Sequence, residues 1–187
     1  MRIISGIYKG KKVLEPIDKK TRPLRDMVKE SIFNLLLHSN FINLNLKECL
    51  VLDLFSGSGS FGLECLSRNA KHVTFVENHK PAIETLYKNV RNFNLLNNYL
   101  LINQDIFSKK FASNLNKKFD LIFADPPYKE ERISNLFSIL YENKILKKNG
   151  LFIVHRNKKS YEFNNDRFKI IEIRIYGISK IIFYKLK

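Results

Sequence analysis

The chain lacks the residues that mark several protein classes. It has no tryptophan, and only two cysteines and two methionines among 187 residues. Cys49 and Cys65 do not have the spacing of a zinc site, so we expect reduced core residues and no metal. No apolar run approaches the roughly 20 residues that cross a bilayer, and no signal peptide is apparent at the start. These absences favour a cytoplasmic protein with a single domain.

Acidic residues are also few, with 18 against 33 lysines and arginines, giving a net charge of +15 and a pI near 9.8. Such an excess favours a polyanionic partner, because neutralised phosphates supply most non-specific affinity for nucleic acid. A bias toward Lys, Asn and Ile can also arise from AT-rich coding sequence. The distribution supports a partner, since residues 1–30 carry nine basic side chains against four acidic ones.

Between residues 50 and 156, apolar runs of strand length alternate with longer stretches of helical periodicity. The runs are nearly continuous, as in parallel strands buried on both faces. Asn78 and Pro81 suit the start of one helix. The predicted strands are 50–54, 72–77, 99–104, 119–124 and 151–154, and the predicted helices are 60–68, 80–93, 106–114 and 131–147. Repeated β–α units predict a doubly wound sheet that binds ligands at the carboxyl ends of its strands.

The two ends of the chain differ from this pattern. Residues 1–14 contain short apolar pairs broken by glycine, which predicts a small β-ribbon. Residues 26–37 have a helical apolar face, with Asp26 as a possible cap. Residues 168–176 and 179–185 are β-rich runs around a glycine, which predicts a hairpin that adds antiparallel strands to the sheet.

Residues 53–62 read Asp-Leu-Phe-Ser-Gly-Ser-Gly-Ser-Phe-Gly and directly follow a predicted strand. Their glycines spell G-x-G-x-x-G, and Glu77 lies about twenty residues on, as in a dinucleotide-binding fingerprint. We disfavour that interpretation because the carboxylate of Asp53 would repel a negatively charged pyrophosphate. An acid here suits S-adenosylmethionine, which has no phosphate but carries a cationic amino group and a sulfonium. The glycines allow the backbone to approach it closely.

Acidic residues also end the next two strands. Glu77 can accept hydrogen bonds from the ribose hydroxyls, and Asp105 from the adenine amine, with Ile106 packed on the ring. Asp105 can equally cap the segment that follows it. The predicted cofactor-binding residues are Asp53, Phe55, Gly57, Gly59, Glu77, Asn78, Asp105 and Ile106.

A second motif, Asp125-Pro126-Pro127-Tyr128, follows another buried strand. Two prolines fix two φ angles and remove two backbone donors, which leaves the Asp125 carboxylate and the Pro126 carbonyl as rigid acceptors. Acceptors placed on the hydrogens of an exocyclic amine hold it and stabilise the charge that develops during methyl transfer. Tyr128 offers a face on which a flipped base can stack. We predict Asp125, Pro126, Pro127 and Tyr128 as the catalytic residues.

With these motifs the chain resembles the RsmD family, bacterial methyltransferases that act on guanine N2 in small-subunit ribosomal RNA. Residues 1–12 resemble the family's basic opening ribbon, residues 22–34 its second block and residues 176–184 its closing hairpin. The resemblance covers nearly the whole chain. The tetrapeptide 125–128 is shared with adenine and cytosine amino-methyltransferases, so the blocks near the start of the chain narrow the resemblance to this family.

The resemblance implies a Rossmann-like class I methyltransferase fold that uses S-adenosylmethionine. We expect a mostly parallel seven-stranded sheet, with residues 1–37 as a basic RNA-docking extension packed on the cofactor site and residues 38–187 as the methyltransferase domain. The implied activity is methylation of a specific guanine N2 on the assembling small ribosomal subunit, by a monomer. The predicted substrate-binding residues are Lys9, Lys11, Lys12, Arg22 and Arg25.

The residues after strand 151–154 depart from the family pattern, and two other functions remain as alternatives. After strand 151–154 the family often carries a glutamate, whereas His155 and Arg156 follow here, and we assign His155 no role. A DNA adenine-N6 methyltransferase would share the catalytic motif, but such enzymes usually carry a separate target-recognition domain. A non-catalytic RNA-binding assembly protein could keep the fold, although the intact motif at 125–128 argues against it.

Overall fold

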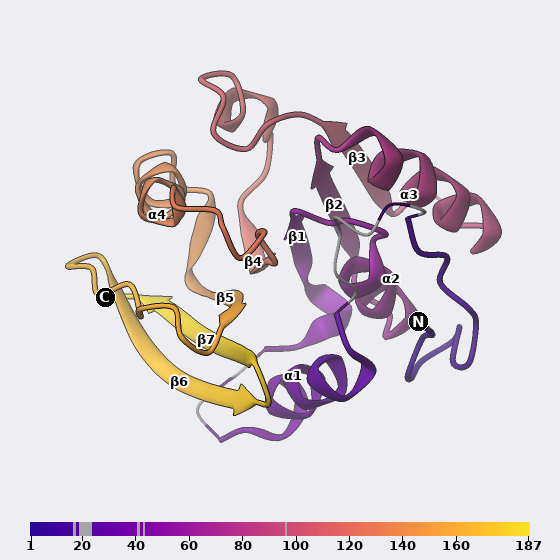
Figure 1. The fold of residues 1–187 in the computed structure, drawn as a ribbon, viewed down its shortest axis with the longest axis horizontal. Coiled ribbons are helices and arrows are strands. Elements are labelled where there is room, and N and C mark those ends of the chain that lie inside the picture. The colour runs from indigo at the N-terminus through magenta and orange to yellow at the C-terminus, as the bar shows by residue number, and fades with distance from the viewer. Residues whose placement is uncertain (17, 19–23, 41, 43, 96) are drawn as a thin grey trace.

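The fold is an open sheet of seven strands with helices on both faces, seen in a computed structural model that describes residues 1–187 except 17, 19–23, 41, 43 and 96 (Figure 1). The strand order is β3-β2-β1-β4-β5-β7-β6. The strands are β1 (Leu50–Leu54), β2 (His72–Glu77), β3 (Tyr99–Asn103), β4 (Phe119–Ala124), β5 (Leu146–Asn157), β6 (Phe168–Tyr176) and β7 (Ser179–Leu186). The first five in this order pair in parallel, and the β6–β7 hairpin adds two antiparallel strands.

The α-helices are α1 (Asp26–His38), α2 (Ser60–Ser67), α3 (Lys80–Asn92) and α4 (Ile133–Glu142). There are also two short 3-10 helices in the described residues, η1 (Leu46–Glu48) before β1 and η2 (Ala112–Asn114) before β4. In Figure 1, α1, α2 and α3 cover one face of the sheet and α4 the other. Alternation along β1 divides the apolar residues between these faces: Val51 packs with α1 to α3, and Leu52 packs with α4. Two buried cores therefore hold the sheet rigid.

The predicted sheet, its parallel core and the closing hairpin are confirmed. Residues 1–13 form the expected narrow ribbon, with a bridge between Arg2 and Lys12 and hydrogen bonds from Ile3 N to Lys11 O and from Val13 N to Met1 O. Both cysteines are free and buried, as predicted. Within the described part of the chain, no helix combines the length and apolarity needed to span a membrane.

Several local predictions were wrong. Residues 106–114 are mostly turns, because Asp105 accepts hydrogen bonds from Phe107 N and Ser108 N and starts a tight turn instead of a helix. The helix expected at 131–147 ends earlier, since Lys144 has a positive φ of 52° and β5 already begins at Leu146. Neither predicted cap holds: α1 is preceded by Arg25 and α3 by His79, without side-chain cap hydrogen bonds.

Candidate active site

The candidate site lies where the order of the strands reverses. From β1 the chain moves outward to β2 and β3, then returns to place β4 on the other side of β1. Asp53 lies near the carboxyl end of β1, and Asp125 follows β4 directly, with its N–H donating to Leu54 O at 3.3 Å. Both predicted motifs therefore meet at the switch point, where open α/β sheets bind ligands.

The glycine loop is a tight turn held by its own hydrogen bonds. Phe55, Gly57 and Gly59 have positive φ angles of 56°, 56° and 81°. The Ser56 hydroxyl donates to Asp53 O at 2.6 Å and accepts from Val76 N at 3.0 Å, which fixes the loop between β1 and β2. Gly59 precedes α2, so the loop ends at a helix N-terminus.

The three glycines of this motif are needed for different structural reasons. A Cβ on Gly59 would approach Leu86 Cδ1 to 2.4 Å, and one on Gly62 would approach Phe75 Cε1 to 2.3 Å. Gly59 allows the loop to pack against α3, and Gly62 allows α2 to pack against β2. A Cβ on Gly57 would meet no atom within 4 Å. Of the three, Gly57 is the one whose missing side chain opens space beside the loop, as close approach of a ligand requires.

Asp53 is buried, and the carboxylates of Asp125 and Glu77 lie near enough to affect its ionisation. Burial raises the pKa of Asp53 well above its usual range, the N–H of Gly62 at 3.0 Å opposes this rise, and nearby Asp125 and Glu77 add to it. Asp53 itself is only 2% exposed. A buried acid between two further carboxylates favours a cationic ligand. The site therefore fits the sulfonium and amino groups of S-adenosylmethionine, and contact between the cofactor and Asp53 stays a prediction.

Glu77 has a structural task beside its predicted one. Its Oε2 accepts from Gly57 N at 2.8 Å, and its Oε1 accepts from Asn78 N and His79 N at 2.9 Å each. One carboxylate thus ties the glycine loop to the start of α3. A carboxylate has about four lone-pair sites, so capacity remains for a ribose hydroxyl, and contact with ribose stays a prediction. The Asn78 side chain is exposed beside it.

The expected adenine end is built by aromatic rings as well as Asp105. Ile106 is 3% exposed and belongs to the core, whereas the rings of Phe55 and Phe107 lie 6.2 Å apart beside it. Arg132 stacks over Phe107 at 4.1 Å from its centroid and lies 3.8 Å from the Asp105 carboxylate. Sequence reasoning named neither Phe107 nor Arg132, because it placed Phe107 in a predicted helix at 106–114 and Arg132 at the start of another at 131–147.

The Asp125–Tyr128 turn is clamped by the end of β5. His155 Nδ1 lies 2.7 Å from Asp125 Oδ1. The Tyr128 ring meets the His155 ring edge-on at 6.0 Å. Arg156 donates to Pro127 O and Tyr128 O at 3.2 and 3.4 Å. Sequence reasoning assigned His155 no role, and the structure brings this side chain against the central carboxylate of the predicted site.

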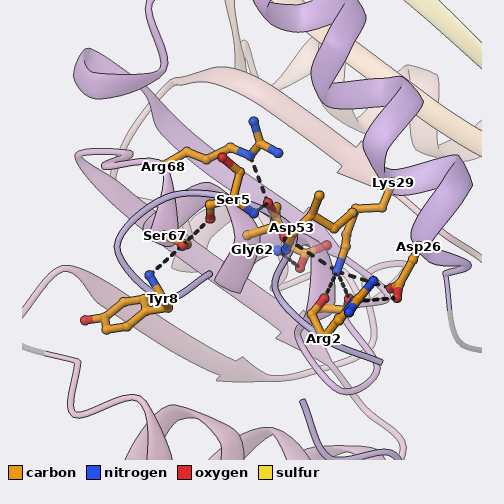
Figure 2. A network of polar contacts seen from close by, with 12 residues as sticks. Arg2, Ser5, Tyr8, Asp26, Lys29, Asp53, Gly62, Ser67 and Arg68 are labelled. Carbon is orange, nitrogen blue, oxygen red and sulfur yellow. Dashed lines mark hydrogen bonds and ion pairs between the residues drawn. The ribbon is translucent and has the colours of Figure 1, made fainter. Parts of the chain in front are cut away.

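The head (residues 1–14) is fastened to α2 by a buried polar network (Figure 2). Glu64 accepts from Ile4 N at 2.8 Å and Ser5 N at 3.0 Å, and lies 3.6 Å from Lys29 Nζ. Figure 2 shows Lys29 reaching from α1 toward Arg2, and its Nζ donates to Arg2 O at 2.8 Å. Glu64 and Lys29 are both fully buried. Desolvation lowers the pKa of Lys29, and Glu64 opposes that change.

The predicted substrate-binding residues differ in their availability. Lys9, Lys12 and Arg25 are exposed. Lys11 is engaged by the protein, since it donates to Asn92 O and its ammonium lies 4.7 Å from the Phe93 ring centroid. Arg22 lies outside the described residues. Across the part of the chain that the structure describes, no three His, Cys, Asp or Glu side chains gather as metal ligands.

The parallel sheet with its antiparallel hairpin, the glycine loop after β1 and the acid-led turn after β4 define a methyltransferase of the Rossmann-like class I architecture. A family model described as "Conserved hypothetical protein 95" matches residues 1–185. The chain belongs to this family, the RsmD family.

Named relatives and solved structures agree with this membership. The chain is 33% identical to the ribosomal RNA small subunit methyltransferase D of Haemophilus influenzae, covering 99% of this chain and 93% of that one. It is 30% identical to the Escherichia coli protein of the same name, over 82% and 73% of the two chains. A Haemophilus influenzae crystal structure described as a "putative methylase" superposes with a TM-score of 0.75 at 30% identity, covering 100% and 98% of the chains.

Proposed function

We propose that this protein transfers a methyl group from S-adenosylmethionine to the exocyclic N2 of a guanine in small-subunit ribosomal RNA. The observation that carries the proposal is the placement of two carboxylates at neighbouring strand ends. Buried Asp53 suits the cationic cofactor, and Asp125 suits the amine that receives the methyl group. The relatives named small subunit methyltransferase D support ribosomal RNA as the substrate class.

In this reaction the protein contributes mainly the positions of the two reactants and the electrostatic stabilisation of the transition state. S-adenosylmethionine supplies an electrophilic methyl group when bound. Asp125 and the Pro126 carbonyl accept hydrogen bonds from the amine, so that its nitrogen points at the methyl carbon. These acceptors also stabilise the positive charge that develops on nitrogen. Tyr128 stacks on the flipped base, a contact of about 1–3 kcal/mol in single-stranded complexes.

Transfer of tritium from labelled S-adenosylmethionine tests the proposal. The substrates are small subunits from a strain that lacks the endogenous enzyme, the naked ribosomal RNA, and duplex DNA, followed by nucleoside analysis. We expect label in N2-methylguanosine from subunits. Label in N6-methyladenine of DNA would overturn the substrate, and no label in any of them would overturn the activity.

An Asp125→Ala variant separates catalysis from a binding role. We expect it to bind S-adenosylmethionine but to transfer no methyl group and to fail to restore N2-methylguanosine in a deletion strain. If the variant restored every deletion phenotype without restoring the modified nucleoside, assembly binding would be the function and methylation would be incidental.

A further inference from the structure

His155 ends a run of buried residues along β5, next to the proposed methyl-transfer site. Parallel pairing places Val154 beside Ala124, so the residues that follow, His155 and Asp125, emerge together at the carboxyl edge. The His155 side chain is 9% exposed, and its Nδ1 lies 2.7 Å from Asp125 Oδ1. Its Nε2 is buried and has no hydrogen-bond partner among the described residues.

The two ring nitrogens have different roles in this arrangement. An ionised carboxylate only accepts hydrogen bonds, so Nδ1 must carry the hydrogen that it donates to Asp125. Nε2 makes no hydrogen bond to a described residue. Nδ1 is therefore the ring nitrogen that acts on Asp125, as a directed donor to Oδ1.

We propose that His155 is a positioning residue for methyl transfer, which fixes the Asp125 carboxylate so that Oδ2 faces the substrate amine. Oδ1 is held by Nδ1, and no described residue donates to Oδ2. A carboxylate free to rotate about its Cβ–Cγ bond would hold the amine less well in line with the methyl group, and small losses of alignment are costly. This inference rests on the proposed function of Asp125.

Arg156 supports the same turn at its other end. Its guanidinium donates to Pro127 O and Tyr128 O, while Glu130 N also donates to Pro127 O at 2.9 Å. Adjacent residues of β5 therefore hold the side chain of Asp125 and the backbone that carries Tyr128. Because the turn backbone keeps these supports without the imidazole, loss of His155 is expected to loosen one carboxylate and leave the turn in place.

Two substitutions of similar shape test the proposal. His155→Asn keeps a donor close to the position of Nδ1, and His155→Leu has the same branching at Cγ but no donor. We expect His155→Leu to lower kcat on small subunits by about 10- to 100-fold, the usual cost of a lost hydrogen bond to a charged group. We expect His155→Asn to recover most of this loss, to within about threefold of wild type.

Further readouts separate positioning from folding and from failure of the proposed function. Affinity for S-adenosylmethionine is expected to be equal in the two variants, because neither change touches the proposed cofactor residues. The unfolding midpoint of each variant, measured alongside, shows whether a loss of kcat comes from unfolding. Equal kcat in the Asn and Leu variants would overturn the proposal. If wild type methylates no substrate, the proposed function fails. Long-range 1H–15N spectra of the imidazole still test the contact between His155 and Asp125. We expect the hydrogen to lie on Nδ1 in wild type and this preference to be lost in Asp125→Ala.

Discussion

Asp53 and Asp125 end neighbouring strands, yet their surroundings fit them for opposite partners. Asp53 is buried, receives a hydrogen bond from Gly62 N, and has a pKa that burial and the nearby carboxylates of Asp125 and Glu77 raise. Asp125 is partly exposed and has an imidazole donor on one oxygen. Among the described residues, Asp53 suits a cationic partner and Asp125 presents an acceptor. Burial and hydrogen bonding, and not residue type, therefore distinguish the proposed cofactor half of the site from the proposed substrate half.

The raised pKa of Asp53 predicts that cofactor affinity rises with pH. An acid whose pKa is higher in the folded than in the unfolded chain lowers stability as pH rises between the two values. A bound cation reverses this cost because it favours the ionised form. Below the raised pKa, S-adenosylmethionine should therefore bind with release of a proton, measurable by calorimetry in buffers of different ionisation enthalpy.

Asp53→Asn is the matched control, because it keeps an oxygen for Gly62 N but cannot ionise. We expect it to bind the cofactor roughly 10- to 100-fold more weakly, as when a charged hydrogen bond is lost, and to abolish the proton release. Unchanged proton release in Asp53→Asn would assign the effect to another group.

We expect alanine substitutions at two glycines of the loop to cause different defects. Gly57→Ala introduces left-handed strain of about 1–2 kcal/mol and fills the space left for the cofactor, so affinity should fall more than stability. Gly59→Ala adds a clash with Leu86 Cδ1 to the same strain, so stability should fall further, by about 2–4 kcal/mol in total. Urea denaturation and cofactor titration measure both. Equal stability losses would contradict the distinction.

Sequence reasoning found the motif residues but not their supports. Asp53, Gly57 and Asp125 are recognisable because each follows a buried strand within a short motif. His155 lies 30 residues from the carboxylate that it contacts, and Glu64 lies 60 residues from Ile4. Such pairs depend on strand order and helix packing, which no local pattern encodes. A glutamate within the apolar run of α2 was the one available sign that a buried cation is nearby.

At the scale of elements, α2 connects the cofactor loop to the head. Its first turn supplies Gly62 N to Asp53, and its later turns present Glu64 and Ser67 to the backbone of the head. The Ser67 hydroxyl donates to Ser5 O at 2.5 Å and accepts from Tyr8 N at 3.0 Å. An eight-residue helix is thus buried along its whole length, so displacement of the head would also disturb the cofactor loop.

Glu64→Gln should destabilise the protein by about 3–5 kcal/mol, because it leaves Lys29 as a buried charge without its main partner. Adding Lys29→Met should restore part of that loss, since it removes the unpaired charge. Urea denaturation of both single variants and the double variant gives the coupling. Additive losses would show that the two side chains do not act as a pair.

The predicted elements were most accurate where burial alone defines them. Strands β1, β2 and β4 match their predicted ranges because each is a mostly apolar and buried run. Prediction failed at 106–114 and at the end of α4, where a side chain accepting backbone hydrogen bonds and a residue with positive φ decided the outcome. Local patterns specify what is buried, whereas the end of an element depends on single hydrogen bonds.

At the scale of the whole molecule, the positive charge is unevenly available. Lys9 and Lys12 project from the ribbon into solvent, whereas Lys11 and Lys29 are bound to protein oxygens. The net charge of the chain therefore overstates the number of basic side chains that are available to bind a polyanion. The ribbon that carries these exposed lysines is hydrogen-bonded to α2, so the phosphate contacts proposed for Lys9 and Lys12 would be made from an anchored segment.

Reversing Lys9 and Lys12 to glutamate should weaken binding to small subunits without changing affinity for S-adenosylmethionine. Loss of two phosphate contacts should lower the slope of log K against log salt by about 1.4–1.8, the counterions released by two charges. Lys117→Glu with Lys118→Glu is the matched control, since both lysines are exposed just before the amino end of β4, opposite the site. Binding across a salt series checks the prediction. If the control pair lost as much affinity and slope as the head pair, net charge alone would account for binding, and the head would have no docking role of its own.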